Sequence, residues 1–242
     1  MECEVYVKHS IPNREPAIIM LCLHIDDLLV FGNCSKKKYA RDILRRFNIV
    51  GYNPVVIPIA VNGKLEIDSD EELADSTIFK QIVDSLRYLC NTRLDICYSV
   101  GVVSRFMQRS KHSHWLAVKR IMRYVQGTIE HGILFTTDLK QENGDLVGYS
   151  YLDWCGDKND RRSNSGYVFN FMKSLIAWSS KKQPLITLSS CETEHIAGSY
   201  SACQSLWLES LTIELKLDVC RPIPLMIDNI STINLAKNFV SH

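Results

Sequence analysis

The first part of the chain has the hydrophobic pattern of a strand hairpin followed by a helix. Two apolar runs at residues 18–23 and 28–31 have strand length and enclose the sequence His24-Ile25-Asp26-Asp27. The basic stretch 36–47 follows, with apolar residues at helical spacing. Residues 48–76 then hold glycines, prolines and an acidic run at 68–75, which predicts a linker.

Three further helices are predicted between residues 77 and 128, because apolar residues recur there every three or four positions. The stripes consist of Ile78, Ile82, Leu86 and Leu89; of Ile96, Val100, Val103 and Met107; and of Trp115, Val118, Ile121, Met122 and Val125. Gly127 is a typical residue to end the third helix.

After Gly144 the apolar period changes to that of strands. We expect strands at 146–154, 166–172, 175–180 and 225–227. Ser189 with Glu192 has the capping-box pattern of a helix start. We expect this helix to turn Ile196, Cys203, Leu206 and Trp207 inward, and a last helix to begin near Ser231. Three strands, a helix, a strand and a helix predict an α+β layer.

Composition adds few constraints. The 242 residues are enough for one large or two small domains, and a net charge of +1 does not indicate a nucleic-acid binder. The nine cysteines are scattered, which argues against a disulfide framework and predicts buried, reduced thiols. The apolar run at 17–32 is too short and too charged to span a bilayer, and the N-terminus lacks a signal-peptide pattern. We therefore expect an intracellular protein, cytoplasmic or nuclear, with no membrane contact.

Acidic residues at the ends of predicted elements are the candidates for chemistry. Asp26 and Asp27 between two apolar strands repel each other and would suit a divalent cation, although a polar hairpin tip is also possible. In the last domain Asp153, Glu194 and Asp228 stand on three different elements. Acids that converge from separate elements are typical of two-metal hydrolases. Taken singly each has a plain surface explanation, since a glutamate also favours a helix N-terminus.

Several motifs in series carry a resemblance to a known family. The sequence His24–Asp27 resembles the Tyr-Val-Asp-Asp hairpin of reverse transcriptases. Residues 81–89, 102–107 and 117–128 are similar to the stretch between polymerase and nuclease in copia-type retrotransposons, and 153–157, 161–169 and 188–197 to their ribonuclease H domain. The motifs stand in the family's order over nearly the whole chain, which is identified as a truncated C-terminal part of a copia-type Pol polyprotein.

The resemblance implies four regions. These are a reverse transcriptase palm and thumb remnant at 1–48, a linker at 49–76, a helical connection region at 77–140 and a ribonuclease H-like domain, incomplete at its end, at 141–242. The implied fold class is α+β, with a ribonuclease H-like mixed sheet preceded by a palm hairpin and helices.

The resemblance also implies roles for individual acids. Asp26 and Asp27 match the polymerase hairpin, and Glu194 and Asp228 match two metal-binding acids of ribonuclease H. In the family's Asp-x-Asp-Trp pattern the first aspartate is replaced by Tyr151, while Asp153 is the second. Tyrosine is mostly neutral near pH 7. Residues 151 and 153 face the same side of a strand about 6.6–6.8 Å apart, so Asp153 would replace the lost acid only after a slip of two residues.

We therefore expect an ancestral role in DNA synthesis and in cleavage of RNA–DNA hybrids with Mg²⁺ or Mn²⁺, and no activity in the chain as given. Two further departures support this expectation: the chain begins after the other polymerase aspartate and stops before the last nuclease acid. The alternative is a non-catalytic nucleic-acid-binding or interaction module. Its phosphate contacts would come from Lys119, Arg120, Arg123, Arg161 and Arg162. For the basic residues of the third helix, a solvated helix face is the simpler interpretation.

Overall fold

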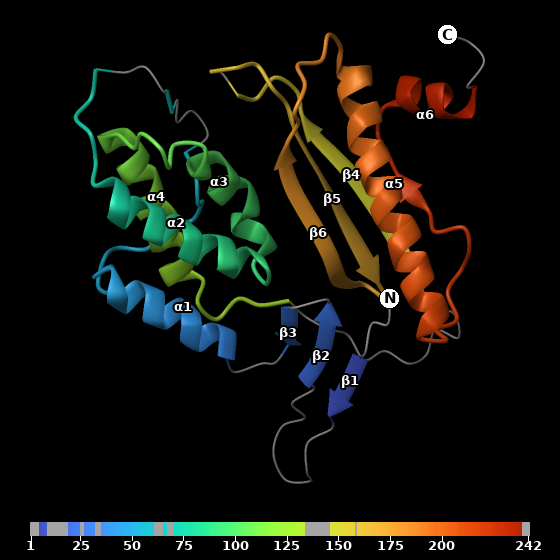
Figure 1. Cartoon of the computed structure of the whole chain (residues 1–242), viewed down its shortest axis with the longest axis horizontal. Coiled ribbons are helices and arrows are strands. Elements are labelled where there is room, and N and C mark those ends of the chain that lie inside the picture. Colours follow the sequence, from blue (N-terminus) through green and yellow to red (C-terminus); the bar gives the residue numbers. More distant parts are fainter. Residues whose placement is uncertain are drawn as a thin grey trace. The chain divides into compact units, whose positions relative to one another are not determined.

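The computed structural model describes residues 5–8, 19–24, 27–31, 35–60, 65–66, 70–133, 146–157 and 159–238. These residues form a mixed α+β structure, and Figure 1 labels its helices and strands. The chain divides into two compact units. One comprises residues 1–58 with 119–131, and the other comprises 59–118 with 132–242. Helix α4 (His112–Gly127) contributes residues to both units.

The first unit contains the predicted hairpin. Strands β1 (Val5–Lys8), β2 (Ile19–His24) and β3 (Asp27–Phe31) form an antiparallel sheet in that order. The strands β2 and β3 confirm the prediction, whereas β1 was not predicted. Helix α1 (Ser35–Arg46) agrees with the helix expected at 36–47.

The end of α4 packs closely in this unit. A Cβ atom at Gly127 would lie 2.7 Å from the Cβ of Pro54, so the position requires a residue without a side chain. Just beyond α4, Glu130 accepts hydrogen bonds from Lys37 at 2.6 Å and from Arg41 at 2.9 Å. These exposed pairs join α1 to the chain that follows α4.

The second unit begins with the predicted helices α2 (Ser76–Cys90) and α3 (Leu94–Ser104), which pack together. Asp75 caps α2 by accepting hydrogen bonds from the N–H groups of residues 77 and 78. The buried stripe of α2 includes Phe79 rather than the predicted Ile78, which is 40% exposed. The prediction for this stripe was therefore wrong by one residue at its start.

Part of the segment predicted as a linker is hydrogen bonded to the chain before α4. The N–H of Ala74 donates to the carbonyl of Ser110 at 2.9 Å, and the N–H of His112 donates to that of Glu72 at 3.0 Å. These bonds hold residues 72–74 against 110–112 as a short antiparallel bridge.

A four-stranded sheet forms the rest of the second unit. It contains β4 (Leu146–Asp153), β5 (Asn164–Phe171), β6 (Ser174–Lys182) and β7 (Leu225–Met226) in the order β6-β5-β4-β7. The strands β4, β5 and β6 are antiparallel neighbours, whereas β7 runs parallel to β4. All four strands lie where the apolar pattern predicts them.

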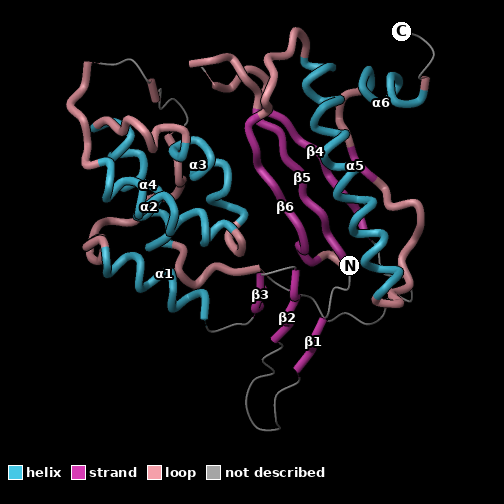
Figure 2. The backbone as a smooth tube through the Cα atoms, viewed as in Figure 1, coloured by secondary structure: helices cyan, strands magenta, loops and turns pink. Residues whose placement is uncertain are grey.

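Helix α5 (Ser190–Glu214) covers one face of this sheet (Figures 1 and 2). Beneath it lies a core of Leu146, Phe169, Leu208, Val219 and Ile223. Gly148 belongs to the same face, where an added Cβ would lie 2.4 Å from the ring of Phe169. The last helix, α6 (Ile230–Lys237), begins close to the predicted Ser231.

The predicted inward face of α5 was wrong. Cys203 is exposed, Leu206 is 64% exposed and Trp207 is 47% exposed, while Ile196 is only partly buried. The buried positions include Ala197, Gly198 and Ser201 instead. Small residues bring a helix close to a sheet, so the contact face here is not the one with the largest apolar side chains.

Helix α3 contacts β6, and a partly buried ion pair joins its end to the turn after β4. Arg105, the C-cap of α3, donates to Asp157 at 2.7 Å and to the side-chain oxygen of Asn164 at 2.5 Å. Lys182, the last residue of β6, also donates to Asp157. Burial pushes the pKa of Asp157 upward, but hydrogen bonds from Lys182 and Asn159 and the charge of Arg105 outweigh it and lower this pKa to about 2.

The six cysteines whose side chains the structure describes are free thiols, as predicted, but the prediction that they are buried was wrong, since Cys203 and Cys220 are exposed and the other four are only partly buried. No helix in the described part of the chain is long and apolar enough to cross a membrane.

Candidate functional site

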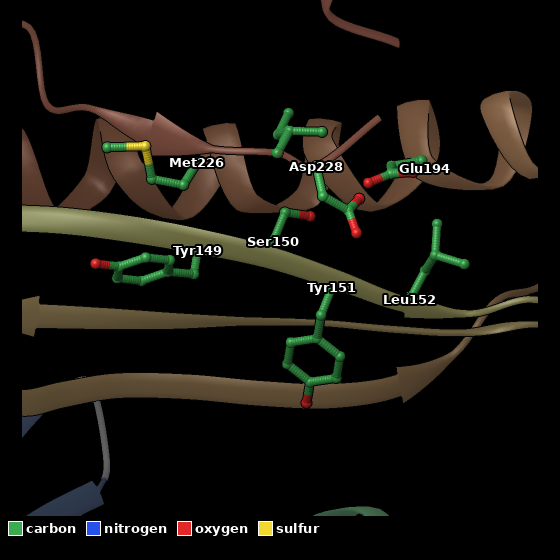
Figure 3. Close-up of a pocket in the computed structure, with 8 residues that line it drawn as sticks. Tyr149, Ser150, Tyr151, Leu152, Glu194, Met226 and Asp228 are labelled. Carbon is green, nitrogen blue, oxygen red and sulfur yellow. The ribbon is translucent and has the colours of Figure 1, made fainter. Parts of the chain in front are cut away.

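A pocket of about 380 Å³ lies at the edge of β4, beyond the end of β7 (Figure 3). The strand β7 pairs with β4 only at Gly148–Leu225 and Tyr149–Met226, so the next residues of β4 have no strand neighbour on that side. The pocket is lined by Tyr149, Ser150, Tyr151, Leu152, Glu194, Met226, Ile227 and Asp228. It therefore combines β4, the end of β7, the start of α5 and the turn after β7.

Glu194 enters the pocket from the first turns of α5. The side chain of Ser189 caps this helix by accepting from the N–H of Glu192, and Glu192 in turn accepts from the N–H of Leu188 at 2.8 Å. The expected capping pattern is thus present, although Glu192 bonds the residue before the cap. This start fixes Glu194 at 4% exposure, facing the sheet.

Asp228 reaches Glu194 from the turn after β7. In Figure 3 the two carboxylates point toward one another. Burial raises the pKa of Glu194 to about 7, and the hydrogen bond and negative charge of Asp228 add to this shift, while Asn229 opposes it. One oxygen of Glu194, Oε1, is buried without a hydrogen-bond partner among the described residues. Two adjacent carboxylates with an unsatisfied oxygen fit a hard cation.

Tyr151 lies on β4 beside the pocket but turns its ring away. The pairing of β4 with β7 ends at Tyr149–Met226, two residues before Tyr151 and Asp228. The Tyr151 hydroxyl donates to the carbonyl of Ser179 on β6 at 3.0 Å, across the intervening strand. Its ring occupies the space where Gly166 would carry a Cβ. Figure 3 shows the ring directed away from Glu194 and Asp228, so the pocket receives no third acid from this position.

Asp153 does not join the pair. It faces the same side of β4 as Tyr151, as strand alternation predicts. Its carboxylate accepts a hydrogen bond from the Tyr98 hydroxyl of α3 at 3.1 Å and lies against Gly156. It is not among the pocket residues. Across the described residues, no three His, Cys, Asp or Glu side chains gather closely enough to hold a metal ion.

Sequence reasoning missed two residues of this site. Ser150 lies on the opposite face of β4 from Tyr151, and its hydroxyl is buried without a partner in the described structure. Alternation along the strand was the available signal. Asn229 caps α6 by accepting from the N–H groups of Ser231 and Thr232 and also influences Glu194. An asparagine two residues before Ser231 was the corresponding helix-start signal.

Sequence comparison places the chain among known proteins. The retrovirus-related Pol polyprotein from transposon RE1 of Arabidopsis thaliana is 39% identical over 86% of the chain, and that from transposon TNT 1-94 of Nicotiana tabacum is 34% identical over 86%. The chain belongs to the copia-type retrotransposon Pol polyprotein family. It covers 14% and 16% of the lengths of these two polyproteins.

A shorter relative matches over most of its own length. An uncharacterized mitochondrial protein of Arabidopsis thaliana is 32% identical over 72% of this copia-type chain and 70% of its own length. No family model matches the chain, and no solved structure matches it.

The polymerase-like acids of this Pol fragment lie at the β2–β3 connection. Asp26 lies outside the described residues. Asp27 is the first residue of β3, and its backbone pairs with His24 at the end of β2. The hairpin backbone therefore has the layout that the sequence motif predicts.

The basic residues proposed for phosphate contact have different surroundings. Arg120 donates from Nε to the carbonyl of Ile57 at 3.2 Å, and Arg123 donates to that of Asn53 at 2.7 Å. These two arginines of the Pol fragment hold residues 53–57 against α4. Arg162 pairs with Asp160 at 3.6 Å, Arg161 is exposed, and Lys119 is partly buried on α4. The five cations therefore divide between α4 and the turn before β5.

Proposed function

We propose that residues 146–238 are a ribonuclease H-like domain of a Pol polyprotein, which retains a two-carboxylate cation site and does not cleave RNA–DNA hybrids at a useful rate. The observation that carries this proposal is the meeting of Glu194 and Asp228 in one pocket, with a tyrosine on the adjacent strand position. The mixed sheet with α5 on one face supports the same fold.

The donor set of the pocket fits one divalent cation. Glu194 and Asp228 would hold it, and Mg²⁺ or Mn²⁺ would supply Lewis-acid stabilisation of a phosphate oxygen. Two cations repel strongly at short range and need more carboxylate than this pair supplies. Tyr151 adds no charge, because burial raises the pKa of its phenol above the ordinary value. The chain's own groups therefore favour binding over hydrolysis.

The polymerase reaction has less support. The acids Asp26 and Asp27 match the family's hairpin, and a polymerase role of this segment in an intact polyprotein rests on that motif alone. For the 242-residue chain we propose no primer extension. Addition of labelled nucleotides to a primed template in Mg²⁺ or Mn²⁺, abolished by Asp27→Asn, would contradict this.

A cleavage assay with the full chain tests the nuclease proposal. The protein is incubated with a labelled RNA–DNA hybrid in Mg²⁺ or Mn²⁺ beside the matched variant Glu194→Gln, which keeps the shape of the side chain. We expect the same background in both. Cleavage by the unmodified chain that disappears in the variant would show that the two carboxylates are sufficient for catalysis.

Hybrid binding measured at two salt concentrations addresses the alternative module. Salt-sensitive binding that weakens in Arg161→Ala would favour non-catalytic recognition of phosphates, because each phosphate contact adds to the salt dependence. Arg123→Ala is not suitable for this comparison, since Arg123 also holds the backbone of Asn53.

A further inference from the structure

Two cysteines meet at the corner between α2 and α3. Cys90 is the last residue of α2, and Cys97 lies in the first turn of α3 after a short connection. The side chains of the two cysteines interact, and each shifts the pKa of the other. The sulfur of Cys97 also lies 3.5 Å from the carbonyl oxygen of Cys90 and 3.4 Å from that of Arg93. The pair forms no part of the carboxylate pocket.

The surroundings make the two thiols unequal. Both are only partly buried, so a small oxidant has access to them. The hydrogen bond from Cys90 lowers the pKa of Cys97 against the effect of burial, and Trp178 contributes in the same direction. The pKa of Cys90 is raised, first by the hydrogen bond with Cys97 and then by burial. Of the charged neighbours, Asp95 opposes ionisation of both thiols and Arg87 favours that of Cys90.

We propose that Cys90 and Cys97 form a reversible disulfide when hydrogen peroxide oxidises the protein. The Cys97 thiolate attacks one peroxide oxygen, the O–O bond breaks, and the departing hydroxide takes up a proton to become water. The sulfenic acid on Cys97 is then attacked by the sulfur of Cys90, which loses its proton, and the S–O bond breaks to release a second water. In total the two thiols lose two electrons, and one hydrogen peroxide molecule gains them and is reduced to two waters.

The position of the pair gives the disulfide a structural consequence. The indole N–H of Trp178 on β6 donates to the carbonyl of Cys90 at 2.9 Å, so the corner also anchors the sheet. A bond between residues 90 and 97 would close the connection between α2 and α3 and restrict the unfolded chain. We expect the oxidised protein to melt at a higher temperature than the reduced one and to show altered emission from Trp178.

Peptide mapping of the full chain tests the proposal. The reduced protein is treated with one equivalent of hydrogen peroxide, its free thiols are alkylated, and its digest is analysed by mass spectrometry with and without dithiothreitol. We expect a cross-linked peptide joining residues 90 and 97, loss of alkylation at both, and recovery of both thiols on reduction. Recovery of Cys90 as a free thiol while Cys97 carries a sulfinic or sulfonic group would overturn the proposal.

Matched variants give a second measurement. In Cys97→Ser the cross-link and the rise in melting temperature on oxidation should both vanish, whereas Cys203→Ser on the exposed side of α5 should retain both. If Cys97→Ser does not fold, the mapping of the unmodified chain still decides. A cross-link that joins either cysteine to a different residue, in preference to this pair, would also contradict the assignment.

Discussion

At the residue scale, Glu194 is a carboxyl group whose surroundings oppose its ionisation. It is 4% exposed, and Asp228 places a second negative charge beside it. Its pKa is raised from 4.5 to about 7, so the folded protein holds a proton that the unfolded chain has already released. Ionisation of Glu194 therefore reduces the free energy of unfolding.

A pH series without divalent cations tests this. Between pH 4.5 and about 7 the folded state binds more protons than the unfolded state, so we expect this residue's contribution to stability to decline on the order of a few kcal/mol and then level off. Urea unfolding with EDTA at each pH provides the measurement. Glu194→Gln should remove most of the decline, and excess Mg²⁺ should reduce it. An identical pH profile in the variant would mean that Glu194 is ionised throughout.

Tyr151 offers a second test at this scale. We expect Tyr151→Asp to raise the affinity for Mg²⁺, because it adds a carboxylate to the pocket that Glu194 and Asp228 also line. The same change removes a ring from above Gly166 and a hydrogen bond to Ser179, so it should lower stability by roughly 1–3 kcal/mol. Calorimetric titration and urea unfolding measure the two effects.

Tyr151→Phe is the matched control for that experiment. It retains the ring and loses only the hydroxyl, so it should leave Mg²⁺ affinity unchanged and cost about 0.5–1.5 kcal/mol. Equal Mg²⁺ affinity in the unmodified protein and in Tyr151→Asp would show that residue 151 does not face the cation.

At the element scale, the apolar period predicts where helices and strands lie better than which side of them is buried. The period locates α2, α3, α4 and the four strands of the large sheet. It fails for α5, where Gly198 comes close to Ile227 and Ala197 is buried, while Trp207 is exposed. Close approach to a sheet selects for small side chains, which carry little signal in a pattern based on apolar size.

The ion pairs that Asp157 forms with Arg105 and Lys182 are a second feature at this scale. Asp157 is 5% exposed and binds both Arg105 and Lys182. We expect Asp157→Asn to lower the free energy of unfolding by about 3–5 kcal/mol, because it leaves two cations without their buried partner. Thermal and urea unfolding measure this loss.

Asp160→Asn is its control. Asp160 pairs with Lys182 and Arg162 but is much more exposed, so its removal should cost less than about 1 kcal/mol. In the unmodified protein the pKa of Asp157 lies below its usual 3.8, so its contribution is present above that pH and disappears as the pH falls toward 2. Similar losses in the two variants would indicate that burial of Asp157 does not decide the strength of the network.

At the scale of the whole molecule, the candidate site brings together residues that lie far apart in the sequence, and no local sequence pattern predicts that they meet. Ser150, Glu194 and Asp228 come from a strand, a helix and a turn that follow one another at wide spacing. The resemblance to copia-type elements selects the two acids, but it does not give the two-residue length of β7 or the direction of the Tyr151 ring. Both depend on pairing register and on packing partners far along the chain.

The second unit also includes α2 and α3, which the sequence analysis assigns to a separate connection region at residues 77–140. Helices α2 and α3 belong with the large sheet, which Arg105, Tyr98 and the carbonyl of Cys90 contact directly. We therefore expect a fragment of residues 141–242 to melt at a lower temperature and less cooperatively than a fragment of 59–242. Circular dichroism melts compare them, and equal melting would show that the sheet and α5 are self-sufficient.

The contact between Tyr151 and Gly166 ties the tyrosine to the stability of the sheet. A glycine within a strand leaves backbone exposed, and an aromatic ring from the neighbouring strand compensates for the missing side chain. Selection for a folded chain alone would then retain the tyrosine. Replacement of Tyr151 by aspartate would add charge beside the pocket and uncover the glycine in the same step, so any gain in cation binding would come with a loss of stability.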